Sequence, residues 1–267
     1  MTKQKIVYEI DGLIPYINWA YFYFAWQLRD AGEQARMRRE AEDMLKTFCG
    51  RYRAYALVMI AEACSDGDDI IFNGVRIPLL RQQSRPEDAG PCLCLSDFIR
   101  PSGKGVADTA GLFATTVDMG LETDFGRDDY MKMMAQLLAD RLAEAAAERL
   151  HEHVRKHLWG YAPDEALTMD ELHAERFTGI RPAVGYPSLP DTSINFIISD
   201  ILGMGDIGIR LTESGAMKPH ASVSGLMLSH PASRYFAIGK IGEDQLQDYA
   251  RRRGLPAEVL RRFISQI

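Results

Sequence analysis

The longest regular pattern of apolar and polar positions covers residues 128–158 and predicts a helix. This segment is rich in Ala, Leu, Met, Glu and Arg and contains neither Gly nor Pro, a composition that favours an unbroken helix. A broad apolar stripe runs along one face and consists of Leu137, Leu138, Leu142 and Ala145. Glu144 borders that stripe, where a carboxylate is costly unless it has a partner.

An aromatic segment near the N-terminus, residues 14–28 (IPYINWAYFYFAWQL), is the most lipophilic stretch of the chain. It is shorter than the ~20 residues of a membrane-spanning helix, and Asn18 and Gln27 interrupt it. Aromatic side chains of this kind also lie at membrane interfaces, but we expect these to be buried in the protein core. The polar segment that follows, residues 31–49, predicts a helix with a charged outer side.

Shorter apolar runs predict β-strands between turns. Residues 55–63 form a compact apolar run, and an acidic turn at residues 66–69 separates it from a second short strand. That turn lacks the spacing of a calcium loop, so we interpret it as a solvated turn. Residues 92–99 and 111–117 predict two further strands. No repeat, low-complexity tract or convincing linker divides the chain, so we expect one domain.

The C-terminal third alternates short helical pieces with turns. Residues 243–266 predict a charged helix that is broken near Gly254 and Pro256. Three consecutive arginines, Arg251, Arg252 and Arg253, lie in this segment with acidic residues nearby. We interpret them as a solvated helix end rather than as a phosphate site.

Composition narrows the class of protein. The chain has 267 residues, of which 46% are hydrophobic and 25% charged, as in a globular protein with a sizeable core. A net charge of −6 argues against a nucleic-acid-binding face. The first twelve residues have no apolar targeting core, so we expect a cytoplasmic protein that is not membrane-bound. The four cysteines form no Cys-x-x-Cys pair and are predicted to be thiols rather than disulfides or metal ligands.

Two motifs suggest chemistry but lack the required context. Residues 203–208 match Gly-x-Gly-x-x-Gly, yet a strand-like segment follows instead of a helix, so we interpret them as a glycine-rich turn. His153 and His157 are one helical turn apart, but no third metal ligand clusters with them. We expect these two and His151 to be surface or capping residues. No nucleophile elbow is present, and we predict no metal site and no catalytic acid or base.

Residues 179–191, GIRPAVGYPSLPD, hold Arg181 and Tyr186 among three prolines and two glycines. Prolines reduce the conformational entropy that is lost when a loop becomes ordered. An arginine offers a fixed fork of donors that suits a carboxylate, and a glycine lets the backbone come close to a ligand. The stretch therefore predicts a preformed binding loop.

Together with the long helix, this stretch is part of a series of strings that resembles the activation domain of cobalamin-dependent methionine synthase. The strings occur in the family's order over residues 14–254, which is about nine tenths of the chain. They are IPYINW (14–19), GDDI (67–70), LRQQ (80–83), CLSDF (94–98), DDY (128–130), LADRLAEAAAERLHEHVRKHLWGYAPDE (138–165), GIRPAVGYP (179–187), LTESGAM (211–217), ASVSG (221–225), SHPASRYFAIGKI (229–241) and DQLQDYARRRG (244–254). The resemblance implies a single α+β domain over residues 1–267, with a twisted antiparallel β-sheet and flanking helices. The sequence fits, because long helices flank scattered short strands without strict βαβ alternation.

The resemblance also implies a ligand site for S-adenosylmethionine. The family's Arg-x-x-x-Gly-Tyr motif corresponds to Arg181, Gly185 and Tyr186, and backbone near Ala183 would read the adenine edge. Carboxylates or aromatic faces would meet the cationic amino group and sulfonium. The further site residues that the resemblance implies are Asn18, Glu144, Glu175 and Tyr235.

The reaction that the resemblance implies is reductive methylation, which returns oxidised cob(II)alamin to methylcobalamin. S-adenosylmethionine would give the methyl group, and a flavodoxin-like donor would give one electron. The cobalamin would lie on a corrinoid-binding partner, because the chain begins at its own Met1 and carries no other methionine synthase module. We therefore expect a reactivation subunit of a split cobalamin-dependent methionine synthase.

The sequence departs from the family pattern at two places. The residue matching Asn18 is often an Asp that meets the ligand's ammonium group, and Asn lacks that charge. The family's His-Thr-Glu-Lys string, which lies towards the corrinoid, is replaced by residues 192–195 (TSIN). Two alternatives therefore stay open: a non-catalytic clamp for a corrinoid protein with a degenerate ligand pocket, or a reactivator of a different corrinoid methyltransferase.

Overall fold

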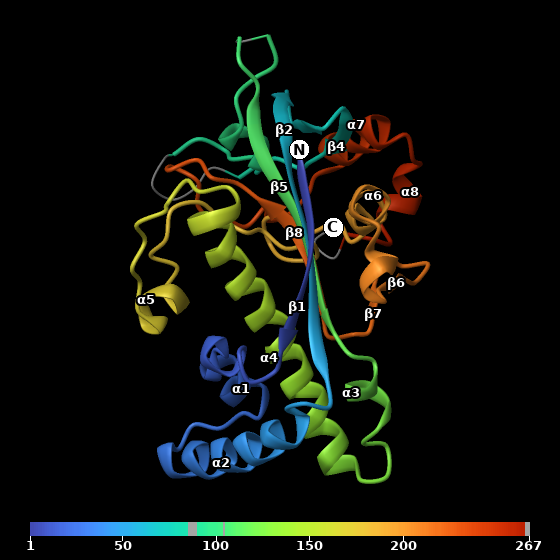
Figure 1. Cartoon of the computed structure of the whole chain (residues 1–267). Coiled ribbons are helices and arrows are strands. Elements are labelled where there is room, and N and C mark those ends of the chain that lie inside the picture. The colour runs from blue at the N-terminus through green and yellow to red at the C-terminus, as the bar shows by residue number, and fades with distance from the viewer. Residues whose placement is uncertain (85–89, 104, 265–267) are drawn as a thin grey trace.

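A twisted antiparallel sheet of six strands forms the centre of the protein in a computed structural model that describes residues 1–84, 90–103 and 105–264 (Figure 1). The strands are β1 (Thr2–Glu9), β2 (Arg53–Asp66), β3 (Asp69–Phe72), β4 (Val75–Pro78), β5 (Asp108–Val117) and β8 (Ser222–Met227). Five of them follow the order β4-β3-β2-β5-β8, and β1 pairs with β2 beside that path. The long strand β2 therefore organises the sheet.

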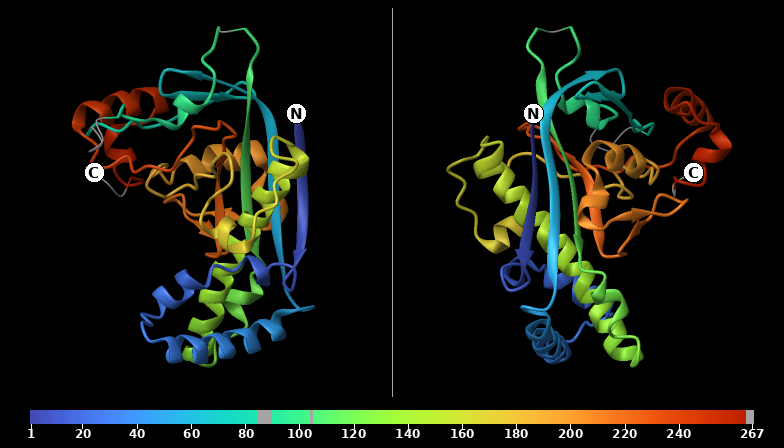
Figure 2. Two further views of the ribbon diagram at one scale, coloured as in Figure 1. Left: turned by 90° about the vertical axis from the view of Figure 1, so that its left-hand side faces the viewer. Right: turned by 45° about the vertical axis from the view of Figure 1, so that its right-hand side comes forward.

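Helices cover both faces of this sheet. The long helix α4 (Asp129–His153) packs across β5, β2 and β8 on one face and continues as one π-helical turn at Val154–Leu158. Helix α6 (Ile194–Leu202) packs on β5 and β8 from the opposite face. Helices α1 (Trp19–Ala25) and α2 (Ala31–Phe48) lie at one end of the molecule, and α7 (Glu243–Arg253) and α8 (Ala257–Leu260) near the other (Figure 2).

The remaining elements are short. They are the 3-10 helices at Ile14–Tyr16, Leu95–Phe98 and Met204–Ile207, the helices α3 (Gly120–Thr123) and α5 (Met169–His173), and the two-stranded sheet of β6 (Arg210–Leu211) and β7 (Met217–Lys218). Among the described residues, no helix combines the length and the apolar character needed to cross a membrane.

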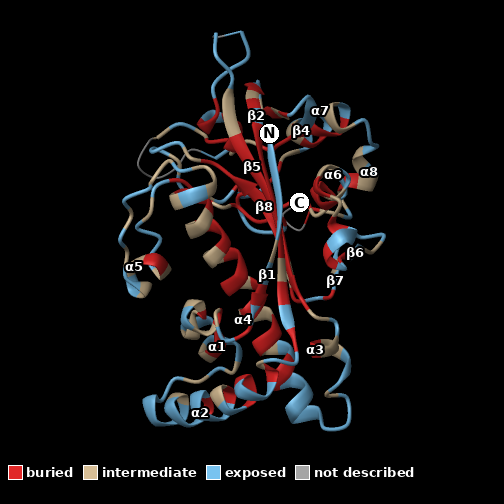
Figure 3. Ribbon diagram, in the orientation of Figure 1, coloured by how far each residue is buried: buried red, intermediate tan, exposed pale blue. Residues whose placement is uncertain are grey.

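The middle of β2 explains why its sequence reads as a continuous apolar run. Ala56, Val58 and Ile60 belong to the core cluster on the α4 side, whereas Leu57 and Met59 belong to the cluster on the other side. Because side chains alternate between the two faces of a strand, both sets must be apolar when both faces are covered. Figure 3 shows the same burial along the inner face of α4 and on the central strands.

The structure confirms the single α+β domain, the helix at 128–158 and the strands at 55–63 and 111–117. The strand predicted at 92–99 is wrong. Leu95–Phe98 form a 3-10 helix instead, because Asp97 accepts a hydrogen bond from the backbone N–H of Cys94 at 2.9 Å and closes a capping box. Only residues 243–253 and 257–260 of the predicted C-terminal helix are helical, and residues 265 and 266 lie outside the described residues.

The aromatic segment is only partly buried, contrary to expectation. Phe22 is buried, but Tyr21 and Phe24 are exposed. The segment forms the short helix α1, which packs against α4, and a helix that packs on one side leaves its other side in solvent. The glycine-rich turn at 203–208 is confirmed, since Gly203 and Gly208 have φ angles of 65° and 84° and a helix precedes them.

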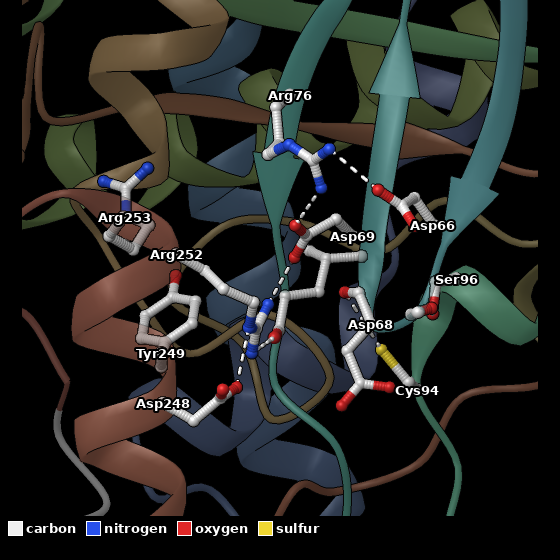
Figure 4. A network of polar contacts seen from close by, with 12 residues as sticks. Asp66, Asp68, Asp69, Arg76, Cys94, Ser96, Asp248, Tyr249, Arg252 and Arg253 are labelled. Carbon is white, nitrogen blue, oxygen red and sulfur yellow. Dashed lines mark hydrogen bonds and ion pairs between the residues drawn. The ribbon is translucent and has the colours of Figure 1, made fainter.

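Two of the three arginines at 251–253, Arg252 and Arg253, and Asp69 of the acidic turn are not solvated as predicted (Figure 4). Arg252 forms ion pairs with Asp69 and with Asp248, and Asp69 also accepts from Arg76 at 2.6 Å. Asp69 is buried, and a buried carboxylate needs such partners. This network attaches α7 to the β2–β3 hairpin.

Candidate functional site

A cavity of about 710 Å³ lies between α4, the start of α1 and the chain around residues 180–188 and 235–236. Residues that the sequence analysis assigned to ligand binding come together there. Seven of the eight line the cavity: Asn18, Glu144, Glu175, Arg181, Ala183, Tyr186 and Tyr235. The eighth, Gly185, lies outside the lining and shapes the turn before Tyr186, with a φ of 87° and its N–H bonded to Leu189 O at 2.8 Å.

The binding loop is held against β8 like an additional strand. Ile180 and Leu228 exchange two backbone hydrogen bonds of 2.9 and 3.0 Å, and Val184 N–H donates to Ser224 O at 2.8 Å. This close approach requires Gly225, because a Cβ there would lie 2.1 Å from the Pro182 carbonyl oxygen. The ASVSG string thus supports the loop that carries Arg181.

Helix α4 supplies two carboxylates to the cavity, one turn apart. Tyr186 donates its hydroxyl to Glu144 Oε1 at 2.6 Å, which gives that carboxylate a partner at the edge of the apolar stripe. Glu148 Oε2 accepts from Arg181 Nη2 at 2.8 Å. Burial and the neighbouring Glu144 raise the pKa of Tyr186, so this phenol stays protonated at neutral pH.

Arg181 is fixed at both its backbone and its side chain. Its backbone N–H donates to Tyr235 Oη at 2.9 Å. Burial is the largest influence on the pKa of Arg181 and acts to lower it, but the interactions with Glu148, Tyr235 and Glu144 together outweigh burial and raise that pKa. The guanidinium therefore remains charged although only 11% of the side chain is exposed.

Glu175 and Asn18 contribute to the cavity in different ways. Glu175 has a φ of 55°, a left-handed conformation that is unusual for a residue other than glycine and is often found at functional sites. Burial raises the pKa of Glu175, although Arg181 acts in the opposite direction. Asn18 is the N-cap of α1, where its Oδ1 accepts from Ala20 N–H at 3.1 Å. Its oxygen is thus already engaged.

Sequence reasoning missed several residues that line the cavity, of which Glu148 contacts Arg181 directly. They are Tyr16, Tyr21, Arg141, Glu148, His173, Pro182, Pro187, Ser188 and Phe236. The spacing of the predicted helix contained the signal for one of them, because Glu148 lies four residues after Glu144 and so on the same face. Arg141 has a comparable signal, because it lies on α4 three residues before Glu144, and the remaining residues come from short helices or irregular segments.

The histidine prediction is wrong for His151. This side chain is buried, stacks edge-on against Phe177 at 4.9 Å between ring centroids and lies 3.4 Å from the Tyr161 hydroxyl. Burial lowers the pKa of His151 well below its ordinary value. Within the described part of the chain, no three His, Cys, Asp or Glu side chains are arranged to hold a metal ion.

Residues 192–195, where the family string is replaced, serve as internal scaffold. Ser193 accepts from Arg253 Nη2 at 2.6 Å. Asn195 is buried, where it donates to Gly215 O at 2.8 Å and accepts from Ser224 Oγ at 2.5 Å. These side chains stabilise the start of α6 and do not reach the cavity lining.

Comparison with known proteins identifies the family and the fold of the chain. A family model described as "Vitamin B12 dependent methionine synthase, activation domain" matches residues 9–254. The crystal structure of the MetH reactivation domain bound to AdoHcy superposes with a TM-score of 0.93 at 37% sequence identity, covering 100% of this chain and 90% of that chain. The resemblance inferred from the sequence strings is confirmed. The chain belongs to the family of activation domains of vitamin B12-dependent methionine synthase.

Proposed function

We propose that the protein binds S-adenosylmethionine in this cavity and supports reductive methylation of cob(II)alamin to methylcobalamin on a corrinoid-binding partner. One observation carries the proposal: seven residues that the family resemblance implies for the ligand site, from distant parts of the chain, line one cavity. The MetH reactivation domain was crystallised with AdoHcy, which differs from S-adenosylmethionine by the transferable methyl group.

The charges around the cavity suit this ligand. S-adenosylmethionine carries one carboxylate and two cationic groups, the ammonium and the sulfonium. Arg181 and Arg141 face three carboxylates in the lining, Glu144, Glu148 and Glu175, so a ligand with one net positive charge is complementary to them. Buried polar atoms without a partner among the described residues, such as Arg181 Nε, also favour a polar ligand here.

The residues of this chain would bind and orient the ligand. Arg181 would take the ligand's carboxylate, Glu175 and Glu144 would face its cationic groups, and Tyr235 and Tyr186 would form aromatic walls. The backbone near Ala183, with Gly185 shaping the turn, would read the adenine edge. S-adenosylmethionine supplies the methyl group, so the protein contributes position and exclusion of water rather than a general acid or base.

The partner and the electron donor belong to this proposal. Methylation of cob(II)alamin requires one added electron, which we assign to a flavodoxin-like donor. The arrangement as a separate subunit stays a prediction. A reconstitution tests these assignments. It combines the purified protein with a corrinoid protein, a reduced flavodoxin and S-adenosylmethionine that is labelled in its methyl group. We expect the label to appear on the corrinoid only when all of these components are present.

Calorimetric titration with S-adenosylmethionine tests the binding site. We expect saturable binding, and Arg181→Ala should weaken it by more than about 1.5 kcal/mol, roughly tenfold. Arg210→Ala, which changes an exposed arginine on β6, is the matched control. Unchanged affinity in Arg181→Ala would overturn the assignment of Arg181.

A non-catalytic clamp for a corrinoid protein is the second candidate, and Asn18 favours it. The Asn18 oxygen caps α1, so this residue offers a cationic group neither charge nor a free acceptor. A clamp would bind the corrinoid protein without S-adenosylmethionine and would transfer no label in the reconstitution. If label reaches the corrinoid of another methyltransferase but not that of methionine synthase, the protein reactivates a different client.

A further inference from the structure

Glu148 is a carboxylate of the cavity that the family motif does not include. It extends from α4 one turn after Glu144, and its Oε2 accepts from Arg181 Nη2 at 2.8 Å. Both side chains of this ion pair are nearly buried, with 13% of Glu148 and 11% of Arg181 exposed, and both line the cavity. The pair therefore lies at the cavity wall, between the protein interior and the ligand space.

A second buried ion pair, between Arg155 and Glu165, has the two-bond geometry that is typical of a structural arginine–carboxylate pair. Arg155 donates to Glu165 through Nε at 2.8 Å and Nη2 at 2.6 Å, and the exposed fractions of the two side chains are 0% and 7%. The Arg181–Glu148 pair has one hydrogen bond instead of two. Arg181 Nε and Glu148 Oε1 are both buried without a hydrogen-bond partner among the described residues, whereas in the Arg155–Glu165 pair only Arg155 Nη1 lacks one. Unsatisfied buried polar atoms in a native structure call for an explanation, and one explanation is function.

Arg181 needs a fixed partner because other carboxylates compete for it. Glu144 and Glu175 both interact electrostatically with the guanidinium. Tyr186 holds Glu144 at 2.6 Å, so Glu144 is committed to another donor. An arginine side chain has several rotatable bonds and loses considerable entropy when it is ordered. A contact that orders it before the ligand arrives removes that cost from binding.

We propose that Glu148 is a positioning residue that holds the Arg181 guanidinium towards the carboxylate of the ligand's amino-acid group. This inference rests on the proposed function, since it assumes that the cavity binds a ligand with that group. It assigns Glu148 a role through Arg181 and not a contact with the methyl group. Without Glu148, the guanidinium would turn towards Glu175 and lose its alignment with the ligand.

Affinities for two ligands distinguish a role of Glu148 in positioning Arg181 from a role in the general stability of the protein. AdoHcy carries the amino-acid group, whereas 5′-methylthioadenosine keeps the nucleoside and the sulfur but lacks that group and is neutral. We expect Glu148→Ala to weaken AdoHcy about tenfold or more, as for the loss of a charge-assisted bond, and to leave 5′-methylthioadenosine within about twofold. Glu148→Gln keeps the shape and one acceptor, so it should give a smaller loss in the same direction. Glu33→Gln, which changes an exposed glutamate on α2 outside the cavity lining, should leave both affinities unchanged.

The opposite result has a clear physical meaning. If Glu148 only neutralises Arg181, its removal leaves a stronger anion site, and AdoHcy binds as tightly as before or more tightly. That outcome in Glu148→Gln or Glu148→Ala overturns the positioning role, and so does an equal loss for both ligands. Thermal unfolding of each variant identifies one that does not fold, and Glu148→Gln then decides. If the unaltered protein binds neither S-adenosylmethionine nor AdoHcy, the proposed function itself fails.

Discussion

Replacing Gly225 with alanine should separate the binding loop from the sheet. Gly225 lies on β8 opposite Ala183, and an added Cβ would lie 2.1 Å from the Pro182 carbonyl oxygen and 2.9 Å from Ala183 Cα. Cβ atoms essentially never approach heavy atoms more closely than 3.0 Å, so the loop must move outward by about 0.9 Å or more. Both close contacts are with backbone, so no side-chain rotation relieves them.

The size of the effect follows from what the loop would lose. Four backbone hydrogen bonds of 2.8–3.0 Å join residues 180–184 to residues 224–228, and each contributes about 0.5–1.5 kcal/mol to stability. Overpacking of this kind typically costs about 1–3 kcal/mol, so we expect the free energy of unfolding to fall by about that amount. A displacement near 1 Å also misplaces Arg181, and we expect affinity for S-adenosylmethionine to fall at least tenfold.

Urea unfolding and calorimetric titration measure the two effects. Gly205→Ala is the matched control, because no heavy atom lies within 4 Å of its added Cβ and no left-handed φ is required there. It should change neither stability nor binding appreciably. If Gly225→Ala behaves like Gly205→Ala in both assays, the close packing of the loop on β8 does not position the site, and the reasoning is refuted.

Three further predictions concern charge. Asn18→Asp should strengthen S-adenosylmethionine binding severalfold in titration, because one carboxylate oxygen would cap α1 and the other would meet a cation; no gain would show that the ammonium lies elsewhere. Burial raises the pKa of Glu175, so the folded protein holds this proton more tightly than the unfolded chain. As pH falls through that raised pKa, the contribution of Glu175 to stability should therefore improve. Binding of the cationic ligand should weaken over the same pH range, because Glu175 loses its negative charge. Glu175→Gln should remove this pH dependence from a series of titrations at different pH values. Glu165→Ala should lower the unfolding free energy by about 3–5 kcal/mol in urea, because it leaves Arg155 charged, buried and without its carboxylate; a loss below about 1 kcal/mol would contradict this.

Much of the candidate site was accessible from sequence because its residues lie in short, rigid strings. Arg181, Gly185 and Tyr186 share a proline-rich loop, and Glu144 stands out as a carboxylate at the edge of an apolar stripe. The contact partners were not accessible. That Tyr186 bonds to Glu144, and Arg181 to Glu148, depends on how the loop crosses α4, which no local pattern encodes.

Two of the wrong predictions, for residues 92–99 and for His151, failed because contacts with residues elsewhere in the chain decided the structure there. Residues 92–99 read as a strand because they are apolar, but Asp97 caps a 3-10 helix there and also binds Arg81 at 2.6 Å. His151 read as a surface residue because two nearby histidines are polar neighbours on the same helix. The His151 ring packs against Phe177, which follows α5 and lies outside the long helix.

The sequence by itself determined the periodic elements and the binding loop, because helix spacing, apolar runs and prolines act on neighbouring residues. It also determined the family, through long strings in a fixed order. Only the tertiary structure decided which charges meet. Asp69 pairs with Arg76 and also with Arg252, which lies 183 residues away in the sequence. Glu148 pairs with Arg181, which lies 33 residues away. Such pairs form because burial makes an unpaired charge costly, and burial is a property of the assembled fold.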